Sequence, residues 1–338
     1  MVDRIRIDGG TVAVDQNPGD TVLRAMLRAG MGFPYECNSG GCGSCKFELV
    51  AGELACLWPE APGLTERDRK RGNRHLACQT CAVGEVTLKT RLQDEYVPRH
   101  PTRRRTARFV DAAAITHDLH EFRFAADGPA DFLPGQYASL ALPGVPTARA
   151  YSMSNLPNPA GEWHFQVRRV PGGQGSACLF DRLRPGDVVE IDGPYGLAWL
   201  REDSPRDIVC VAGGSGLAPM VSIARGAAAA GMLGARRLHF FYGARTARDV
   251  CGESFLHGLN EDAAAIRYHG VVSNPADGEG WAGETGFVHE ALLRHLGAEL
   301  PRHEFYFAGP PPMTQALQEL LMVKHLVPFS QIHFDRFF

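Results

Sequence analysis

The spacing of apolar and polar residues changes twice along the chain and divides it into three regions. The first hundred residues combine alternating segments with one helical pattern, whereas residues 106 to 200 contain short strands separated by turns. After residue 205, apolar strands alternate with helices. At 338 residues the chain is also too long for a single core. We therefore expect a multidomain protein.

The first region predicts a small mixed α+β fold. Residues 2–7 and 11–15 alternate around two glycines, which indicates a hairpin. A helix should begin after a cap at Asp20 and end at Gly30, because its apolar residues share one face. Further strands are expected in these segments: 46–50 and 84–90. Around residues 94–105, prolines and arginines without apolar periodicity predict an exposed linker.

The second and third regions predict different kinds of sheet. Strands punctuated by proline and glycine, with one helical pattern at 175–183, are typical of an antiparallel barrel. They are expected at 106–114, 119–125, 136–142, 149–154 and 163–170. The alternation after residue 205 predicts a parallel sheet with helices on both faces. Its strands are expected at 208–212, 238–242, 266–272 and 304–307, with a helix at 217–230.

Composition narrows the function classes. A net charge of −3 argues against general nucleic-acid binding, and there is no apolar run long enough to span a membrane. The chain opens directly into a strand, so we expect no secretory signal. Nine cysteines with a compact cluster among them fit a reducing cytoplasm better than a disulfide framework.

Four cysteines carry the strongest chemical signal. Cys37, Cys42 and Cys45 have the spacing C-x4-C-x2-C, and Cys78 follows far downstream. Four thiolates with this spacing are typical of a plant-type [2Fe–2S] cluster. Intervening glycines allow backbone angles that bring amide N–H groups close to sulfur. On these residues the chain resembles plant-type ferredoxins, with the four cysteines as ligands.

A zinc ribbon is the alternative, because Cys42-x2-Cys45 and Cys78-x2-Cys81 also form two C-x2-C pairs. That alternative leaves Cys37 unused and gives the glycines no role. With an iron–sulfur cluster, Cys81 and Cys56 are expected to be small buried thiols. A basic run at 67–74 could dock an acidic redox partner, or it could be a solvated face with interleaved acids.

The barrel region contains a candidate flavin site. Arg149, Tyr151 and Ser152 form an R-x-Y-S motif, and Gly175-Ser176 opens a helix that could present N–H groups to phosphate. On these motifs the chain resembles the ferredoxin–NADP reductase superfamily, which binds FAD. The resemblance implies Arg149, Gly175 and Ser176 at the diphosphate. It also implies Tyr151 on the isoalloxazine and Ser152 near its reactive nitrogen.

A glycine-rich loop after the first strand of the third region is the candidate nicotinamide site. Gly213, Gly214, Gly216 and Pro219 resemble the G-G-x-G-x-x-P loop of the same superfamily. The motif differs from G-x-G-x-x-G in its proline and from a nucleophile elbow in lacking the last glycine. Two later segments also match superfamily loops, and they contain these residues: Arg245, Gly309 and Pro310.

Three features refine this resemblance. Many relatives carry a cysteine before the Gly309-Pro310 pair, where this chain has Ala308, so the thiol that helps to place the hydride is absent. The segment after Arg245 lacks a clear basic cluster for a 2′-phosphate, which favours NADH. At the end of the chain, Asp335 and Phe337 look like the acid and aromatic that lie near the flavin in relatives. A C-terminal strand packed on the sheet is an equal alternative.

Together the motifs imply a ferredoxin-like β-grasp domain, a linker, an FAD-binding barrel and an NAD-binding α/β domain. The expected ranges are 1–97, 98–105, 106–203 and 204–338. Nicotinamide delivers hydride and the cluster carries single electrons, so the flavin must lie between them in the electron path. The order resembles reductase components of bacterial multicomponent oxygenases, closest to toluene/benzene monooxygenase reductases.

That resemblance implies, as partner, a Rieske ferredoxin or a di-iron hydroxylase. The alternatives are a reductase for a Rieske dioxygenase or a sugar-deoxygenating system, and a zinc-ribbon flavoprotein that passes no electrons onward. The final oxidised substrate belongs to another polypeptide.

Overall fold

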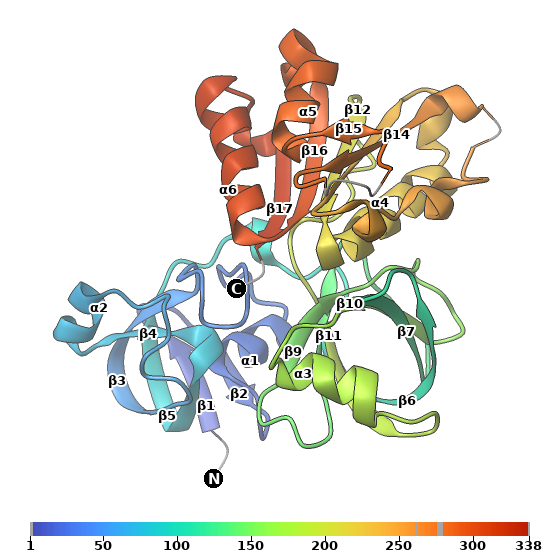
Figure 1. Cartoon of the computed structure of the whole chain (residues 1–338). Helices are drawn as coiled ribbons and strands as arrows, with labels where there is room; N and C mark the ends of the chain where they lie inside the picture. Colours follow the sequence, from blue (N-terminus) through green and yellow to red (C-terminus); the bar gives the residue numbers. More distant parts are fainter. Residues whose placement is uncertain (1–2, 261, 276–279, 337–338) are drawn as a thin grey trace. The chain divides into compact units, whose positions relative to one another are not determined.

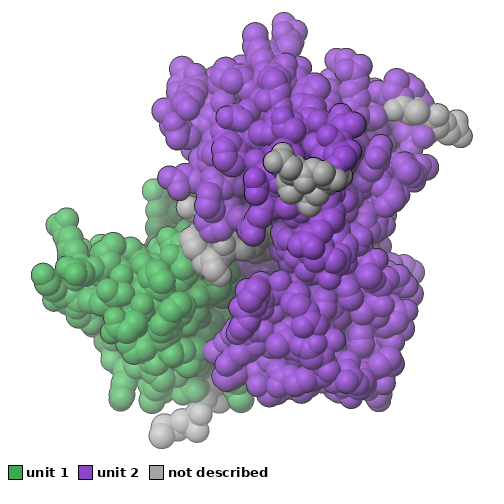
Figure 2. Space-filling model, viewed as in Figure 1, with its two compact units in different colours: residues 1–103, 193–195, 338 green, residues 104–192, 196–337 purple. Residues whose placement is uncertain are grey.

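The computed structural model describes residues 3–260, 262–275 and 280–336. The chain forms two compact units, one of residues 1–103 and 193–195 and the other of residues 104–192 and 196–337 (Figure 2). No helix in the described part of the chain has the length and apolarity needed to cross a bilayer.

The first unit is a five-stranded mixed sheet with the order β2-β1-β5-β3-β4 and one packed helix, α1 (Figure 1). Its strands are β1 (Asp3–Ile7), β2 (Ala13–Gln16), β3 (Lys46–Cys56), β4 (Arg74–Leu76) and β5 (Thr80–Lys89). Its helices are α1 (Val22–Arg28) and α2 (Glu66–Arg71). The β1–β2 hairpin is antiparallel and β1 pairs with β5 in parallel, so the predicted hairpin and mixed fold are confirmed.

The predicted cap of α1 is wrong by one residue. Thr21 is the N-cap, and its hydroxyl accepts from the Arg24 amide at 3.3 Å. Asp20 is fully buried and instead accepts hydrogen bonds from Arg28 at 2.9 to 3.1 Å. A buried carboxylate is stabilised more by a guanidinium than by a backbone N–H at the helix start, because charge-assisted hydrogen bonds are stronger.

The barrel of the second unit is an antiparallel sheet with the order β10-β7-β6-β11-β8-β9. The strands are β6 (Arg103–Ala114), β7 (Leu119–Ala126), β8 (Tyr137–Ala141), β9 (Arg149–Ser152), β10 (Glu162–Arg168) and β11 (Val188–Tyr195). A bridge between Met153 and Phe165 joins the two edge strands. The inward residues form one aromatic-rich core that includes Phe122, Trp163 and Phe165.

Three features of the barrel region differ from the predictions. The sequence predicts no strand after the helical pattern at 175–183, but Val188–Tyr195 form β11. Alternation from Val188 onward signals this strand, and the glycine and proline within it hide the signal. The predicted linker also ends early, because β6 already begins at Arg103. The predicted helix is short: α3 spans Gln174–Ala177, and a π-helical turn continues to Arg182.

The remaining part of the second unit is a six-stranded parallel sheet with the order β15-β14-β13-β12-β16-β17. The strands are β12 (Asp207–Gly213), β13 (Leu238–Ala244), β14 (Ile266–Val272), β15 (Glu284–Thr285), β16 (His303–Gly309) and β17 (Ile332–Arg336). The helices are α4 (Leu217–Ala229), α5 (Val288–Leu296) and α6 (Pro311–Gln318). The C-terminal segment is therefore an edge strand.

Helices cover both faces of this sheet, as predicted. Alternate residues of β12 point into two separate cores: Cys210 packs with Met220 and Ile223 of α4, whereas Val211 packs with residues of α5 and α6. Figure 1 shows α5 and α6 on one side of the sheet and α4 on the other. A strand buried on both faces explains the continuous apolar run at 208–212.

Candidate functional site

The four predicted cluster cysteines form two pairs. Cys45 and Cys78 are buried, with their Sγ atoms 3.4 Å apart. Cys37 and Cys42 form the second pair, linked by a hydrogen bond between their side chains. Each iron of a [2Fe–2S] cluster takes two protein thiolates, so two pairs of thiols suit two irons.

The loop that carries three of these cysteines directs backbone donors at sulfur. The N–H groups of Ser39 and Cys42 donate to Cys37 Sγ at 3.5 and 3.4 Å, and Ser44 N–H donates to Cys42 Sγ at 3.4 Å. The hydrogen bond from the Cys42 thiol outweighs burial and lowers the pKa of Cys37 to about 5. Such donors stabilise thiolates, so the residues present fit an iron–sulfur cluster.

The other two cysteines of this region, Cys56 and Cys81, are less buried than expected. Cys56 was expected to be buried, but it is exposed at the end of β3. Cys81 is half-buried, in β5. Successive residues of a strand face opposite sides of the sheet, so a cysteine on a strand with one solvated face is either buried or exposed. A shift of one residue in the register exchanges the two sides.

The two flavin motifs meet in space. A Cβ atom on Gly175 would lie 2.8 Å from Tyr151 Oη and 3.1 Å from Arg149 Cγ. Gly175 therefore allows α3 to approach β9, which carries both residues. Burial raises the pKa of Tyr151 to about 12, so its phenol remains protonated.

The two serines of the flavin motifs differ in their partners. Ser152 is buried, and its Oγ has no hydrogen-bond partner within the described chain. A buried hydroxyl without a partner fits a position that faces a bound group. The Ser176 hydroxyl instead accepts from the Val170 amide at 3.1 Å and has the carbonyls of Val170 and Gly173 within 3.2 and 3.1 Å, either of which can accept its one proton.

Two segments far apart in the sequence form the candidate nicotinamide site. A Cβ atom on Gly216 would lie 2.0 Å from the Ala308 carbonyl oxygen, and one on Gly213 would lie 2.7 Å from Met313 Sδ. The glycine segment at the end of β12 is thus in direct contact with the end of β16 and the start of α6, where Gly309 and Pro310 lie. Both loops follow the carboxyl ends of parallel strands, where α/β proteins bind ligands.

The remaining predicted residues surround these loops. Asp335 of β17 is buried and pairs in register with Ala308, so it lies beside the Gly309 loop. Pro219 is in the first turn of α4, and the Arg245 side chain is exposed just after β13. Phe337 lies outside the described residues.

Comparison with known proteins identifies the family. Three family models match in order: 2Fe-2S iron-sulfur cluster binding domain at residues 5–83, oxidoreductase FAD-binding domain at 106–199 and oxidoreductase NAD-binding domain at 210–319. A ferredoxin–NAD(P)+ reductase from Metapseudomonas resinovorans is 44% identical over 323 residues, 95% of each chain. The chain belongs to the ferredoxin–NAD(P)+ reductases.

Two further proteins resemble the reductase over nearly its whole length. The ferredoxin–NAD+ reductase component of an alkene monooxygenase system from Xanthobacter autotrophicus is 42% identical, over 94% of this chain and 95% of the relative. The solved structure of the ferredoxin reductase in carbazole 1,9a-dioxygenase superposes with a TM-score of 0.92 at 38% identity, covering 100% and 99% of the two chains. The protein is a reductase of the kind found in oxygenase systems. It passes electrons from NAD(P)H through FAD and a [2Fe–2S] cluster.

An ionic network in the reductase was absent from the predictions. Arg168 of β10 donates to Asp118 at 2.7 Å and to Asp249 at 3.2 Å. Asp249 in turn accepts from the Thr246 amide and hydroxyl at 3.0 and 2.8 Å. Arg168 Nη1 also lies 3.5 Å from the place that a Cβ on Gly214 would take. Arg168 therefore connects the barrel with the glycine loop after β12 and with the segment after β13.

Helix α4 makes a second connection to the barrel. The Ser222 hydroxyl donates to the Asn155 carbonyl at 2.8 Å, and Arg225 donates to the Ser154 carbonyl at 2.9 Å. These residues directly follow the flavin strand β9. The sequence shows only the residue types of these networks, since the partners across them are 50 to 81 positions apart.

Proposed function

We propose that the reductase oxidises NADH and delivers single electrons to the Rieske ferredoxin or the di-iron hydroxylase of an aromatic, toluene/benzene-type monooxygenase. The observations that carry the proposal are an exposed apolar turn beside the thiol loop and a basic helix in the same unit. A bound cluster there exchanges one electron at a time, while a flavin accepts hydride as an electron pair.

The apolar turn contains Leu57 and Trp58, which are 60% and 42% exposed. The turn that holds them contacts the thiol loop: Leu57 N–H donates to the Gln79 carbonyl, and a Cβ on Gly40 would lie 3.1 Å from the Trp58 ring. Exposed aromatic residues are typical anchors of protein interfaces. An acceptor bound here would approach the thiols closely.

The basic helix is α2. Its exposed side chains include Arg67, Lys70 and Arg71. The acids of the helix do not cancel this charge fully, because Asp68 is buried and bound to Lys46 at 2.8 Å. A basic surface attracts an acidic protein and speeds encounter. We therefore assign the surface to an acidic acceptor.

In the second unit, we propose that Arg149, Gly175 and Ser176 bind the FAD diphosphate and that Tyr151 and Ser152 contact its ring system. The unpartnered Ser152 hydroxyl and the contact between the two motifs support this assignment. On the nicotinamide side we propose the predicted glycine loop with Pro219, the pair Gly309-Pro310, Arg245, and the tail residues Asp335 and Phe337.

NADH is favoured over NADPH because Arg168, a basic side chain at the nicotinamide-side loops, is already paired with Asp118 and Asp249. A 2′-phosphate requires a free basic group. The alkene monooxygenase relative is a ferredoxin–NAD+ reductase component by name. We expect kcat/KM for NADH to exceed that for NADPH by about 10-fold or more.

A Rieske dioxygenase system is the second candidate for the acceptor. The carbazole dioxygenase reductase structure favours it, whereas a xylene/toluene monooxygenase electron transfer component from Pseudomonas putida, 33% identical over 323 residues, favours the monooxygenase. The zinc-ribbon alternative lacks support, since the first region matches the 2Fe-2S family model.

The test is NADH-driven reduction of purified acceptors: a Rieske ferredoxin, a di-iron hydroxylase and a dioxygenase ferredoxin. Faster reduction of a monooxygenase component, slowed by Trp58→Ala and by raised salt, would support the proposal. Preference for the dioxygenase ferredoxin would favour the second candidate. Failure to reduce cytochrome c as well would contradict a reductase function.

A further inference from the structure

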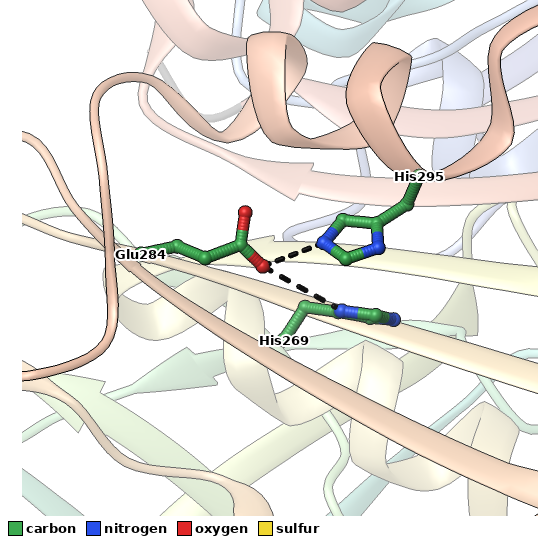
Figure 3. A group of neighbouring side chains, drawn as sticks. All are labelled: His269, Glu284 and His295. Atoms are coloured by element: carbon green, nitrogen blue, oxygen red, sulfur yellow. Dashed lines mark hydrogen bonds and ion pairs between the residues drawn. The ribbon is translucent and has the colours of Figure 1, made fainter.

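Two histidines and a glutamate meet on the face of the parallel sheet that α5 covers (Figure 3). His269 comes from β14, Glu284 from β15 and His295 from the last turn of α5. None of the three belongs to a predicted cofactor position.

Their ligand atoms lie within 4.8 Å of one another. Glu284 Oε1 is 2.6 Å from His295 Nε2 and 3.8 Å from His269 Nδ1. The two imidazole rings are close, with centroids 4.1 Å apart. Donor atoms around a tetrahedral Zn²⁺ are about 3.3 Å apart, given zinc–ligand distances near 2.0 to 2.1 Å. The observed separations lie on either side of that value.

Neighbouring groups hold the three side chains in place. Arg294 donates to Glu284 Oε2 at 3.1 Å, so that oxygen is engaged while Oε1 faces both histidines. The His269 ring stacks on Phe241, with centroids 4.3 Å apart and an interplanar angle of 13°. Hydrogen bonds to the distant carboxylate oxygen and packing of the ring both orient ligands for a metal.

Exposure leaves room for a solvent ligand. The side chain of His269 is 11% exposed, and those of Glu284 and His295 are 32% and 37% exposed. We propose that His269, Glu284 and His295 bind a Zn²⁺ ion, with water in the fourth position. Imidazole and carboxylate are ligands that zinc accepts, and three protein ligands plus water is a common zinc arrangement.

A second cluster shows why this one is distinctive. His117, Asp118 and Asp249 also lie close together. There the guanidinium of Arg168 already bonds both carboxylates, at 2.7 and 3.2 Å, and it supplies the positive charge that a metal would bring. At Glu284 the arginine occupies only Oε2, and Oε1 remains directed at imidazole nitrogens.

The ion would join β14, β15 and α5 across one edge of the sheet. β15 has two residues and pairs only with β14 in the described chain, so it has few other constraints. Binding to the folded state alone stabilises it. We therefore expect zinc to raise the melting temperature of the second unit without being needed for electron transfer.

The test measures zinc on the purified holoenzyme after incubation with Zn²⁺ and removal of excess metal. We expect one zinc per wild-type chain, with the iron content unchanged. His295→Ala and Glu284→Gln should lower zinc affinity by about 100-fold. His289→Ala, a histidine on the same helix outside the cluster, should bind zinc as the wild type does.

X-ray absorption at the zinc edge of the wild type is independent of whether any variant folds. Nitrogen and oxygen neighbours only, with imidazole scattering, would support the site. Sulfur neighbours at about 2.3 Å would place the ion on cysteines and overturn the proposal. Equal zinc binding by wild type and His295→Ala, or no binding by the wild type, would overturn it too.

Discussion

The glycine-rich loops at residues 40–43 and 213–216 contain examples of two different requirements for glycine. Gly40 and Gly43 have φ values of 89° and 78°, which let the loop turn its N–H groups toward sulfur. Gly216 has an ordinary helical φ of −61°, but the Ala308 carbonyl occupies the place of its Cβ. The first requirement is local, whereas the second is imposed by a strand 92 residues later. Substitutions in the two loops should therefore fail in different ways.

Removal of one of the four predicted cluster thiols should have the largest effect. In Cys78→Ser, iron and sulfide should fall from about two each per chain to near zero. NADH-driven cytochrome c reduction should fall by about 100-fold or more, while reduction of ferricyanide directly from the flavin persists. Cys81→Ser is the matched control and should keep its iron. Equal iron loss in the control would make Cys81 necessary for the cluster and would contradict the predicted ligand set.

Gly216→Ala tests the packing requirement of the second loop. The added methyl meets a backbone carbonyl that cannot rotate away, so we expect a loss of about 1 to 3 kcal/mol in the unfolding free energy of the second unit. KM for NADH should rise, because both nicotinamide-side loops must separate. Calorimetry and steady-state kinetics measure the two effects. Gly234→Ala meets no atom within 4 Å and should behave as the wild type.

Arg168→Met tests whether the barrel positions the loop after β13. Asp249 would lose a charge-assisted hydrogen bond while its capping of Thr246 remains, so we expect kcat/KM for NADH to fall by about 10-fold, mainly through KM. Arg169→Met is the control, since its partner Asp181 is exposed and lies on the barrel. A similar loss in both variants would show that general charge, and not this network, matters.

Gly72→Ala should have the smallest effect and isolates conformation from packing. Gly72 ends α2 with φ 76°, and a Cβ there would meet nothing within 4 Å. We expect a loss of about 1 kcal/mol in unfolding free energy, and less for Gly72→Asn, since asparagine tolerates this region. Denaturant unfolding of the two variants measures the difference. If alanine costs no more than asparagine, the left-handed backbone is not the reason for this glycine.

Individual residues show where sequence patterns were sufficient. Thiol spacing predicted which four cysteines lie together, whereas their role as cluster ligands stays a prediction. The strand–helix alternation predicted a parallel sheet with two covered faces, which is confirmed. The cap of α1 was misassigned to Asp20, because two adjacent residues are both good caps and only burial with Arg28 separates them. Strand β11 was missed for a similar reason. Its glycine and proline usually indicate a turn, and only pairing of the other β11 residues with neighbouring strands shows that the segment is a strand.

Sequence alone determined the order of the three regions, which cysteines are candidate ligands, and the residue types of the flavin and nicotinamide motifs, because apolar periodicity and motif spacing are read directly along the chain. Only the tertiary structure decided which of these residues meet. It brought Gly175 to Tyr151, Gly216 to Ala308, and Arg168 to Asp249. Such contacts depend on strand order and register, and no local pattern encodes which distant segment will be the neighbour.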